Sequence, residues 1–306
     1  MPSRIDLAVN LGGLAMANPV TVCSGTFASG REYSDFYNLS LLGAVTTKGV
    51  SLEPWAGNAT PRIAETASGM LNSIGLQNPG VEVFCSKDLP WLSQQGVPII
   101  VNVSGHSVDE YRAVVERLER EPSVGAYEIN ISCPNVDHGG MTIGTDPVLA
   151  AQVTAACRQA TKRPLIVKLT PNVTSVASIA QAVEAEGADA ISLINTVLGM
   201  SIDAKRRKPR LARVVGGLSG PAIKPIALRM VWEVHKAVQV PILGMGGIMT
   251  GEDAVEFMLA GATAIAVGTA SFVNPVAPIQ VLAGIIGYCE EQGVTDINEL
   301  IGGLVC

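Results

Sequence analysis

The chain has 306 residues, of which 48% are apolar and 16% are charged, and its formal net charge is −6 at pH 7. This composition excludes a disordered chain, and the acidic balance excludes the basic surface that nucleic-acid binding requires. Six cysteines are scattered without the close spacing of a zinc or iron–sulfur site, which indicates free thiols in a reducing compartment.

The first predicted element is a β-hairpin before residue 19, because that segment alternates in polarity and contains Gly12-Gly13. Short apolar runs bounded by Gly, Pro, Asn or Ser then recur along the chain. Near-continuous apolarity at this length is typical of strands buried on both faces, as in a parallel sheet. The eight expected strands are 19–25, 43–49, 98–104, 126–132, 164–170, 189–195, 241–247 and 264–270.

Helix signals lie between most of these runs. Ser107–Glu110 has the pattern of a capping box and opens a helix to about Arg120, and Asp146-Pro147 is a cap followed by proline. Further helices are expected at 176–186, 224–238 and 250–261. The alternation predicts a (β/α)8 TIM barrel that takes residues 1–306 as one domain, with the hairpin at its bottom. The long gaps 49–98 and 195–241 predict rim insertions after strands 2 and 6.

Residues 7–30 and 257–289 carry no charge, yet neither is expected to cross a membrane because Gly, Asn and Pro interrupt both. The N-terminus lacks a basic region followed by an apolar one, so no signal peptide is expected. We therefore predict a cytoplasmic protein.

The predicted strands have polar residues at their carboxyl ends, where the active sites of such barrels lie. Two lysines and three asparagines at equivalent ends are hard to explain as core, so we expect a single ligand site. The residues at these ends are Ser24, Lys48, Gly49, Asn102, Asn130, Lys168, Asn195, Thr196, Gly246, Gly247, Gly268 and Thr269.

The last two predicted strands carry the most specific signal. Gly246-Gly247 precedes a helix, and Gly268-Thr269 follows the final strand. The loops after strands seven and eight of such barrels commonly bind phosphate through backbone N–H groups and a helix N-terminus, and glycine permits the close approach. We expect a phosphate-bearing ligand, which these residues leave open among flavin mononucleotide, sugar phosphates and nucleotides.

Cys133 directly follows the fourth predicted strand, where a thiol could act as a nucleophile or transfer a proton. The other internal cysteines, Cys23, Cys85, Cys157 and Cys289, are expected to be small core residues. His138 and the basic run 205–210 are expected to be solvated.

Three motifs together resemble a known family. They are Ser68–Gly80 (SGMLNSIGLQNPG), Asn130–Asn135 (NISCPN) and Gly216–Pro225 (GGLSGPAIKP). In this order they are similar to dihydroorotate dehydrogenases, and more narrowly to the catalytic subunits of the NAD-linked class 1B, from about residue 4 to 302.

The resemblance implies a flavin mononucleotide (FMN) enzyme that oxidises dihydroorotate to orotate in the biosynthesis of pyrimidines, with Cys133 as the catalytic base. The substrate contacts implied are Lys48, Asn72, Ser73, Ile74, Gly75, Leu76, Asn130, Asn195 and Thr196. The flavin contacts implied are Ser24, Lys48, Gly49, Asn102, Asn130, Lys168, Ile194, Gly220, Gly246, Gly247, Gly268 and Thr269. No metal site is expected.

The residue types suit this chemistry. Cys133 would take the proton from C5 while a hydride leaves C6 for flavin N5, and Lys48 can pair with the substrate carboxylate. Asparagine side chains both donate and accept, as the edge of a pyrimidine requires. Lys168 can stabilise the negative charge of reduced flavin.

The chain has neither a strand followed by a GxGxxG motif nor cysteine spacing for an iron–sulfur cluster. The resemblance therefore implies a partner subunit with FAD and a [2Fe–2S] cluster that passes electrons to NAD, and a homodimer of this chain within a heterotetramer. A fumarate-linked dihydroorotate dehydrogenase, another FMN-dependent pyrimidine oxidoreductase and a non-catalytic phosphate-binding barrel remain as alternatives. A dihydrouridine synthase fits poorly, because the acidic chain lacks a basic patch for tRNA.

Overall fold

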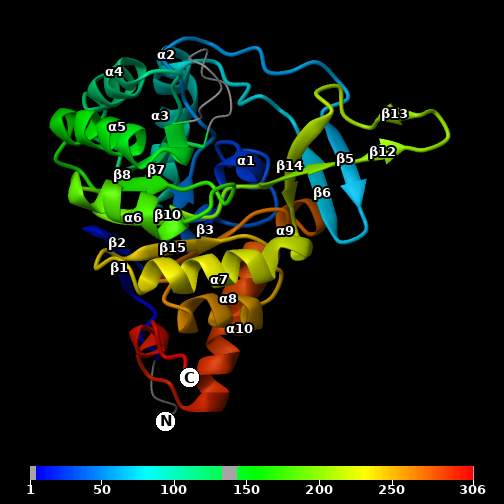
Figure 1. Ribbon diagram of the computed structural model, residues 1–306. Coiled ribbons are helices and arrows are strands. Elements are labelled where there is room, and N and C mark those ends of the chain that lie inside the picture. Colours follow the sequence, from blue (N-terminus) through cyan, green and yellow to red (C-terminus); the bar gives the residue numbers. More distant parts are fainter. Residues whose placement is uncertain (1–4, 133–142, 306) are drawn as a thin grey trace.

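The computed structural model describes residues 5–132 and 143–305 and confirms the barrel (Figure 1). Eight parallel strands form one sheet in the order β3-β16-β15-β10-β9-β8-β7-β4. Each strand lies within one predicted run but is shorter, because the last residues of the run leave the ladder at the rim. The strands are β3 (Val20–Val22), β4 (Val45–Thr46), β7 (Ile99–Val103), β8 (Ala126–Asn130), β9 (Leu165–Lys168), β10 (Ala190–Leu193), β15 (Ile242–Met245) and β16 (Ala264–Val267).

The two end strands of this sheet, β3 and β4, meet and close the barrel. The Gly43 N–H donates to the Val20 carbonyl over 2.8 Å, and the Thr21 hydroxyl donates to the Ala44 carbonyl, also over 2.8 Å. The barrel strands are fully buried, so their apolar side chains fill the interior and contact the surrounding helices.

The five predicted helices are present and form most of the outer ring (Figure 1). They are α4 (Val108–Leu118), α5 (Pro147–Ala160), α6 (Val176–Ala185), α7 (Lys224–His235) and α8 (Gly251–Leu259). The outer ring also includes α10 (Ala277–Gln292), which begins in the uncharged stretch 257–289 and which we did not predict. Shorter helical segments are α1 (Ser24–Phe27), α2 (Val81–Val83), the π-helix Phe84–Asp88, α3 (Leu89–Leu92) and α9 (Ala270–Val273), with 3-10 turns at 39–41, 93–95, 143–145, 221–223 and 297–300.

The predicted capping box of α4 is only half formed. The Ser107 hydroxyl accepts from the Glu110 N–H as expected, over 3.3 Å. The Glu110 carboxylate, however, accepts from the His106 N–H at 2.7 Å, one residue before the cap. The complete box at the start of a ring helix is at α8, where Thr250 and Asp253 satisfy each other's backbone N–H groups.

The predicted hairpin is β1 (Val9–Leu11) paired antiparallel with β2 (Leu14–Met16). Its turn uses Gly12 and Gly13, both with positive φ, and a methyl group at Gly13 would lie 3.4 Å from the Pro164 ring. Gly12 likewise lies against the Asp189 carbonyl. Because Pro164 and Asp189 precede β9 and β10, the hairpin covers the bottom of the barrel, as predicted.

The two rim insertions pair with each other, which the sequence did not predict. The first contributes β5 (Ile63–Thr66) and β6 (Gly69–Asn72), and the second contributes β11 (Val197–Met200) and β14 (Val215–Ser219). Together they form an antiparallel sheet in the order β11-β14-β6-β5. This sheet stands at one side of the barrel (Figure 1), and the short pair β12 (Ile202–Asp203) and β13 (Lys208–Pro209) projects beyond it. The basic run 205–210 is exposed there, as expected.

Asp253 joins two ring helices and is expected to make an acid-sensitive contribution to stability. Its carboxylate accepts from the Met249 and Thr250 N–H groups and from Lys224 Nζ at 2.6 Å. Burial acts to raise the pKa of Asp253, but the bonds from Lys224 and the two amides outweigh it and hold the pKa below the usual 3.8.

We therefore expect Asp253→Asn to lower the free energy of unfolding at pH 7 by about 1–2 kcal/mol. A carboxylate with a lowered folded pKa stabilises the fold above its unfolded pKa and loses that effect as pH falls through the folded value. The difference between variant and wild type in urea unfolding should therefore shrink below about pH 4. A difference that stays constant down to pH 2 would contradict this explanation.

Candidate active site

The predicted site residues that the structure describes lie at the carboxyl ends of the barrel strands or on the side sheet. Asn102, Asn130 and Lys168 belong to β7, β8 and β9, whereas Ile194, Asn195 and Thr196 directly follow β10. Ser24 opens α1, Lys48 and Gly49 follow β4, and Gly246-Gly247 and Gly268-Thr269 follow β15 and β16. Cys133 and His138 lie outside the described residues.

A buried polar network lies at the centre of these strand ends. Lys168 Nζ is 3.6 Å from Oε2 of Glu128, and the two side chains are 6% and 0% exposed. The Asn102 amide donates to the same carboxylate oxygen. Both the Asn102 Oδ1 atom and the Ser104 hydroxyl are buried without a hydrogen-bond partner among the described residues. Buried polar atoms usually have partners, so these two mark a place for a ligand.

Asn130, which ends β8, and Asn195, which follows β10, are also hydrogen-bonded. Asn195 Nδ2 donates to Asn130 Oδ1 over 3.3 Å, and Asn195 Oδ1 accepts from the Thr196 N–H over 2.8 Å. Asn172 supports this turn, because its amide donates to the Thr196 carbonyl and its oxygen accepts from the Leu198 N–H. Asn172 was not among the predicted site residues, although it lies two residues after the predicted fifth strand, where the other polar site residues were expected.

Three predicted glycines, Gly220, Gly246 and Gly247, come together beside Ile194 and Thr269, and we call this place the glycine cradle. Gly220 and Gly247 have φ of 94° and 84°, and a methyl group at Gly247 would lie 2.9 Å from the Gly220 carbonyl oxygen. A methyl group at Gly246 would lie 3.2 Å from Ile194, and one at Gly220 would lie 3.6 Å from Thr269. A Cβ at any of these glycines would come within 3 Å of neighbouring protein atoms, so glycine is what allows the loops after β14 and β15 to pack this closely.

The N-terminus of α8 is less open than we expected for a phosphate site. Its first turn is closed by the Thr250 hydroxyl and the Asp253 carboxylate, and a carboxylate repels an anion. A phosphate at this cradle would therefore depend on the loop at Gly246-Gly247 and on the turn at Gly268-Thr269 rather than on the N-terminus of α8.

Lys48 gives the site an ammonium group that lacks a salt bridge to any described carboxylate. Burial lowers the pKa of Lys48, and the charges of Arg62 and Lys168 lower it further. Lys48 therefore lies near two other cations, of which Lys168 is paired with Glu128. An anionic ligand beside Lys48 would offset this repulsion, which favours a substrate with a carboxylate.

The segment from Asn72 to Leu76 extends from the side sheet. Asn72 ends β6, and its amide donates to the Gly217 carbonyl of β14 over 3.3 Å. Gly217 in turn packs against the Thr196 side chain, which brings the side sheet to the end of β10. The segment Ser73, Ile74, Gly75 and Leu76 contacts an earlier part of the same insertion, where the Ile74 carbonyl accepts from the Asn58 N–H.

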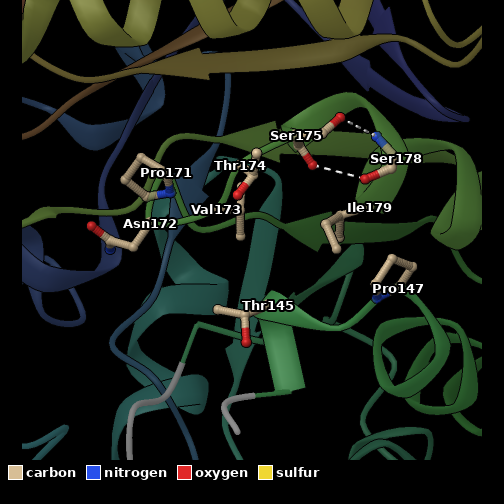
Figure 2. Close-up of a pocket in the computed structure, with 9 residues that line it drawn as sticks. All are labelled: Thr145, Pro147, Pro171, Asn172, Val173, Thr174, Ser175, Ser178 and Ile179. Atoms are coloured by element: carbon tan, nitrogen blue, oxygen red, sulfur yellow. Dashed lines mark hydrogen bonds between the residues drawn. The ribbon is translucent and has the colours of Figure 1, made fainter.

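A cavity of about 560 Å³ opens beside Asn172 on the same rim (Figure 2). Figure 2 shows Thr145 opposite Pro171 and Asn172, with Ser175 and Ser178 hydrogen-bonded to each other at the start of α6. This cavity lies between the loops after β8 and β9, outside the Lys168–Glu128 network. We therefore place the chemistry at the network and the cradle and not in this cavity.

The described cysteines do not have the properties of activated nucleophiles. Burial raises the pKa of the Cys23 thiol to about 11 and that of Cys157 to about 12. Cys85, Cys157 and Cys289 are buried, as expected for core residues, whereas Cys23 is only partly buried and packs against the core. Among the described residues, no cluster of His, Cys, Asp and Glu could hold a metal ion.

Comparison with known proteins identifies the family. A profile described as dihydroorotate dehydrogenase matches residues 6–288. The chain belongs to the dihydroorotate dehydrogenase family. It is 57% identical over 302 residues to the protein named "Dihydroorotate dehydrogenase B (NAD(+)), catalytic subunit" from Alkaliphilus metalliredigens, which covers 99% of this chain and 100% of that protein. The protein of the same name from Alkaliphilus oremlandii is 58% identical over 99% of this chain and 100% of its own length. The one from Pelobacter propionicus is 56% identical over 98% of this chain and 99% of its own length.

A solved member of the family has the same fold. The crystal structure of DHODH in complex with ferulenol from Eimeria tenella superposes with a TM-score of 0.82 over 97% of this chain and 88% of that chain. Its sequence identity is 24%, so this likeness bears on the fold alone. In the part of the chain that the structure describes, no helix is long and apolar enough to span a membrane.

Proposed function

We propose that this chain is the catalytic subunit of an NAD-linked dihydroorotate dehydrogenase, which oxidises dihydroorotate to orotate in the biosynthesis of pyrimidines. The observation that carries the proposal is 56–58% identity, along almost the whole chain, to relatives of that name. The unpaired Lys48 ammonium supports a carboxylate substrate over a neutral pyrimidine base.

The residues present fit FMN. The glycine cradle at Gly220 and Gly247 would receive the phosphate, and the orphaned Asn102 oxygen offers an acceptor to a ring N–H. Lys168, held close by Glu128, would face the flavin ring and stabilise added negative charge. The remaining flavin contacts we propose are Ser24, Lys48, Gly49, Asn130, Ile194, Gly246, Gly268 and Thr269.

When bound, FMN supplies the acceptor for the hydride from C6 of dihydroorotate. Cys133 would remove the C5 proton as general base, and Lys48 would pair with the substrate carboxylate. The hydrogen bond between Asn130 and Asn195 fixes two amides whose remaining donor and acceptor atoms suit the alternating N–H and C=O edge of a pyrimidine. Asn72, Thr196 and the segment Ser73, Ile74, Gly75 and Leu76 would complete the substrate site.

We further propose a separate electron-transfer subunit that carries FAD and a [2Fe–2S] cluster. The relatives' name includes "catalytic subunit", and this chain lacks a sequence motif for a dinucleotide such as FAD or NAD and cysteine spacing for an iron–sulfur cluster. In this proposal two copies of the chain form a homodimer within a heterotetramer in the cytoplasm. No nucleic acid or membrane takes part.

The purified chain should therefore not sustain turnover with NAD by itself. We expect dihydroorotate-dependent NADH formation, measured without oxygen, to be at background for the chain alone and to appear when the electron-transfer subunit is added. Full NAD turnover by the chain alone would contradict the two-subunit proposal. Rapid turnover of the chain alone with fumarate would instead place it in the fumarate-linked class.

A further inference from the structure

Glu128 is a buried carboxylate at the centre of the site, and it has no role in binding or catalysis in the proposed function. It lies on β8, and its side chain is 0% exposed. A carboxylate removed from water destabilises a fold unless it is paired and hydrogen-bonded. The groups that pair with Glu128 therefore indicate the role of its negative charge.

Its partners come from three other strands of the barrel. Lys168 on β9 places Nζ 3.6 Å from Oε2, and Asn102 on β7 donates its amide N–H to the same oxygen. The Ser192 hydroxyl on β10 donates to Oε1 over 2.8 Å. These strands are consecutive in the sheet, β10-β9-β8-β7, so one carboxylate connects four neighbouring strands within the site.

We infer that Glu128 is a positioning residue for the flavin. Glu128 holds the Lys168 ammonium in place as a donor to the imide edge of the ring, and it orients the Asn102 amide so that its oxygen is the adjacent acceptor. The negative charge of Glu128 also lowers the reduction potential of the bound flavin. This inference rests on the proposed function, because it requires that FMN binds at the network.

The orientation of Asn102 follows from the chemistry of the carboxylate. A carboxylate accepts but cannot donate, so the amide must turn Nδ2 toward Glu128 and Oδ1 away from it. Oδ1 is buried without a hydrogen-bond partner among the described residues, and a methyl group at Gly49 would lie 3.0 Å from it. The imide edge of a flavin presents one N–H between two carbonyls, which matches an acceptor (Asn102) beside a donor (Lys168).

The effect on potential follows from the charges. Reduction adds negative charge to the flavin, and the Lys168 cation stabilises it, whereas the Glu128 anion partly cancels that cation. Removing the negative charge while keeping the shape of the side chain leaves the cation uncompensated. The balance then shifts toward reduced flavin.

The test is the midpoint potential of bound FMN in wild-type protein and in Glu128→Gln, measured by anaerobic titration against reference dyes. We expect the variant to favour reduced flavin by roughly tenfold, which is about 30 mV upward for a two-electron couple. Ser192→Ala is the matched control, because it removes a hydrogen bond to Glu128 and keeps both charges. Its potential should remain at the wild-type value.

Glu128→Asp provides a second measurement, which decides the question if Glu128→Gln does not fold. Shortening the side chain by one methylene draws the carboxylate away from Lys168, so the potential should rise by a smaller amount in the same direction. An unchanged or lowered potential in the folded variants overturns the inference. A shift in Ser192→Ala as large as that in Glu128→Gln overturns it too, since packing rather than charge would then explain the effect.

The outcome separates this inference from the proposed function. A wild-type protein that binds no FMN contradicts the proposed function and the inference together. A yellow wild-type protein that dihydroorotate reduces, and whose potential does not depend on residue 128, overturns the inference and leaves the proposed function standing.

Discussion

Replacement of Cys133 by alanine should slow the anaerobic reduction of bound flavin by dihydroorotate about 10²–10⁴-fold, the usual contribution of a general base. The variant should keep its flavin and still bind orotate, because neither the cradle at Gly247 nor Lys48 is changed. Stopped-flow measurement of flavin bleaching, with orotate binding followed by the change in the flavin spectrum, checks both expectations.

The pH dependence gives a second criterion. A thiol has an ordinary pKa of about 8.5, so the wild-type rate should rise as pH approaches that value and the thiolate forms. Cys157→Ala is the control, because burial raises the pKa of that core thiol to about 12 and its loss should change neither rate nor profile. A Cys133→Ala variant that reacts at the wild-type rate, with the same rise, would rule out Cys133 as the base.

Replacement of Gly247 by glutamate should give a folded but colourless protein. Gly247 has φ of 84°, and its Cβ would lie 2.8 Å from Lys224 Cβ and 2.9 Å from the Gly220 carbonyl oxygen, so a side chain displaces the loop that would hold the phosphate. The added carboxylate would also repel a phosphate dianion. Flavin content per chain, measured by absorbance after desalting, should fall to background.

Two comparisons separate loss of the ligand from loss of the fold. Gly287→Glu adds the same charge on α10, where a Cβ meets nothing within 4 Å, and should retain its flavin. Gly247→Ala introduces the backbone strain without the charge and should retain more flavin than Gly247→Glu. Circular dichroism confirms folding in each case. Normal flavin content in a folded Gly247→Glu variant would contradict the proposal that the cradle binds the flavin phosphate.

The barrel was predictable because its strands are buried on both faces and are bounded by turn residues. Runs such as 98–104 and 264–270 therefore stand out in the sequence without knowledge of their partners. The side sheet was not predictable, because β6 pairs with β14 across about 145 residues of chain. Such pairing depends on the loops meeting at the rim, and local sequence does not encode it.

The site was predictable where polar residues end apolar runs, as at Lys168 and Asn195. Glu128 was not predicted as a site residue because it lies inside the predicted strand 126–132, whose mostly apolar sequence is typical of a buried core strand. A lone charge inside a strand buried on both faces is itself a signal, since it must have partners. Those partners became visible only with the register that places Asn102 beside Glu128 and Asn130 beside Lys168.

The central claim is that this chain by itself takes two electrons from dihydroorotate onto a bound flavin. Anaerobic titration of the purified chain with dihydroorotate tests it most directly, with visible absorbance followed alongside orotate formed. We expect a yellow protein that bleaches fully, with one orotate produced per flavin and no NADH when NAD is present without the partner subunit. A colourless protein, or a yellow protein that dihydroorotate does not bleach, would contradict it.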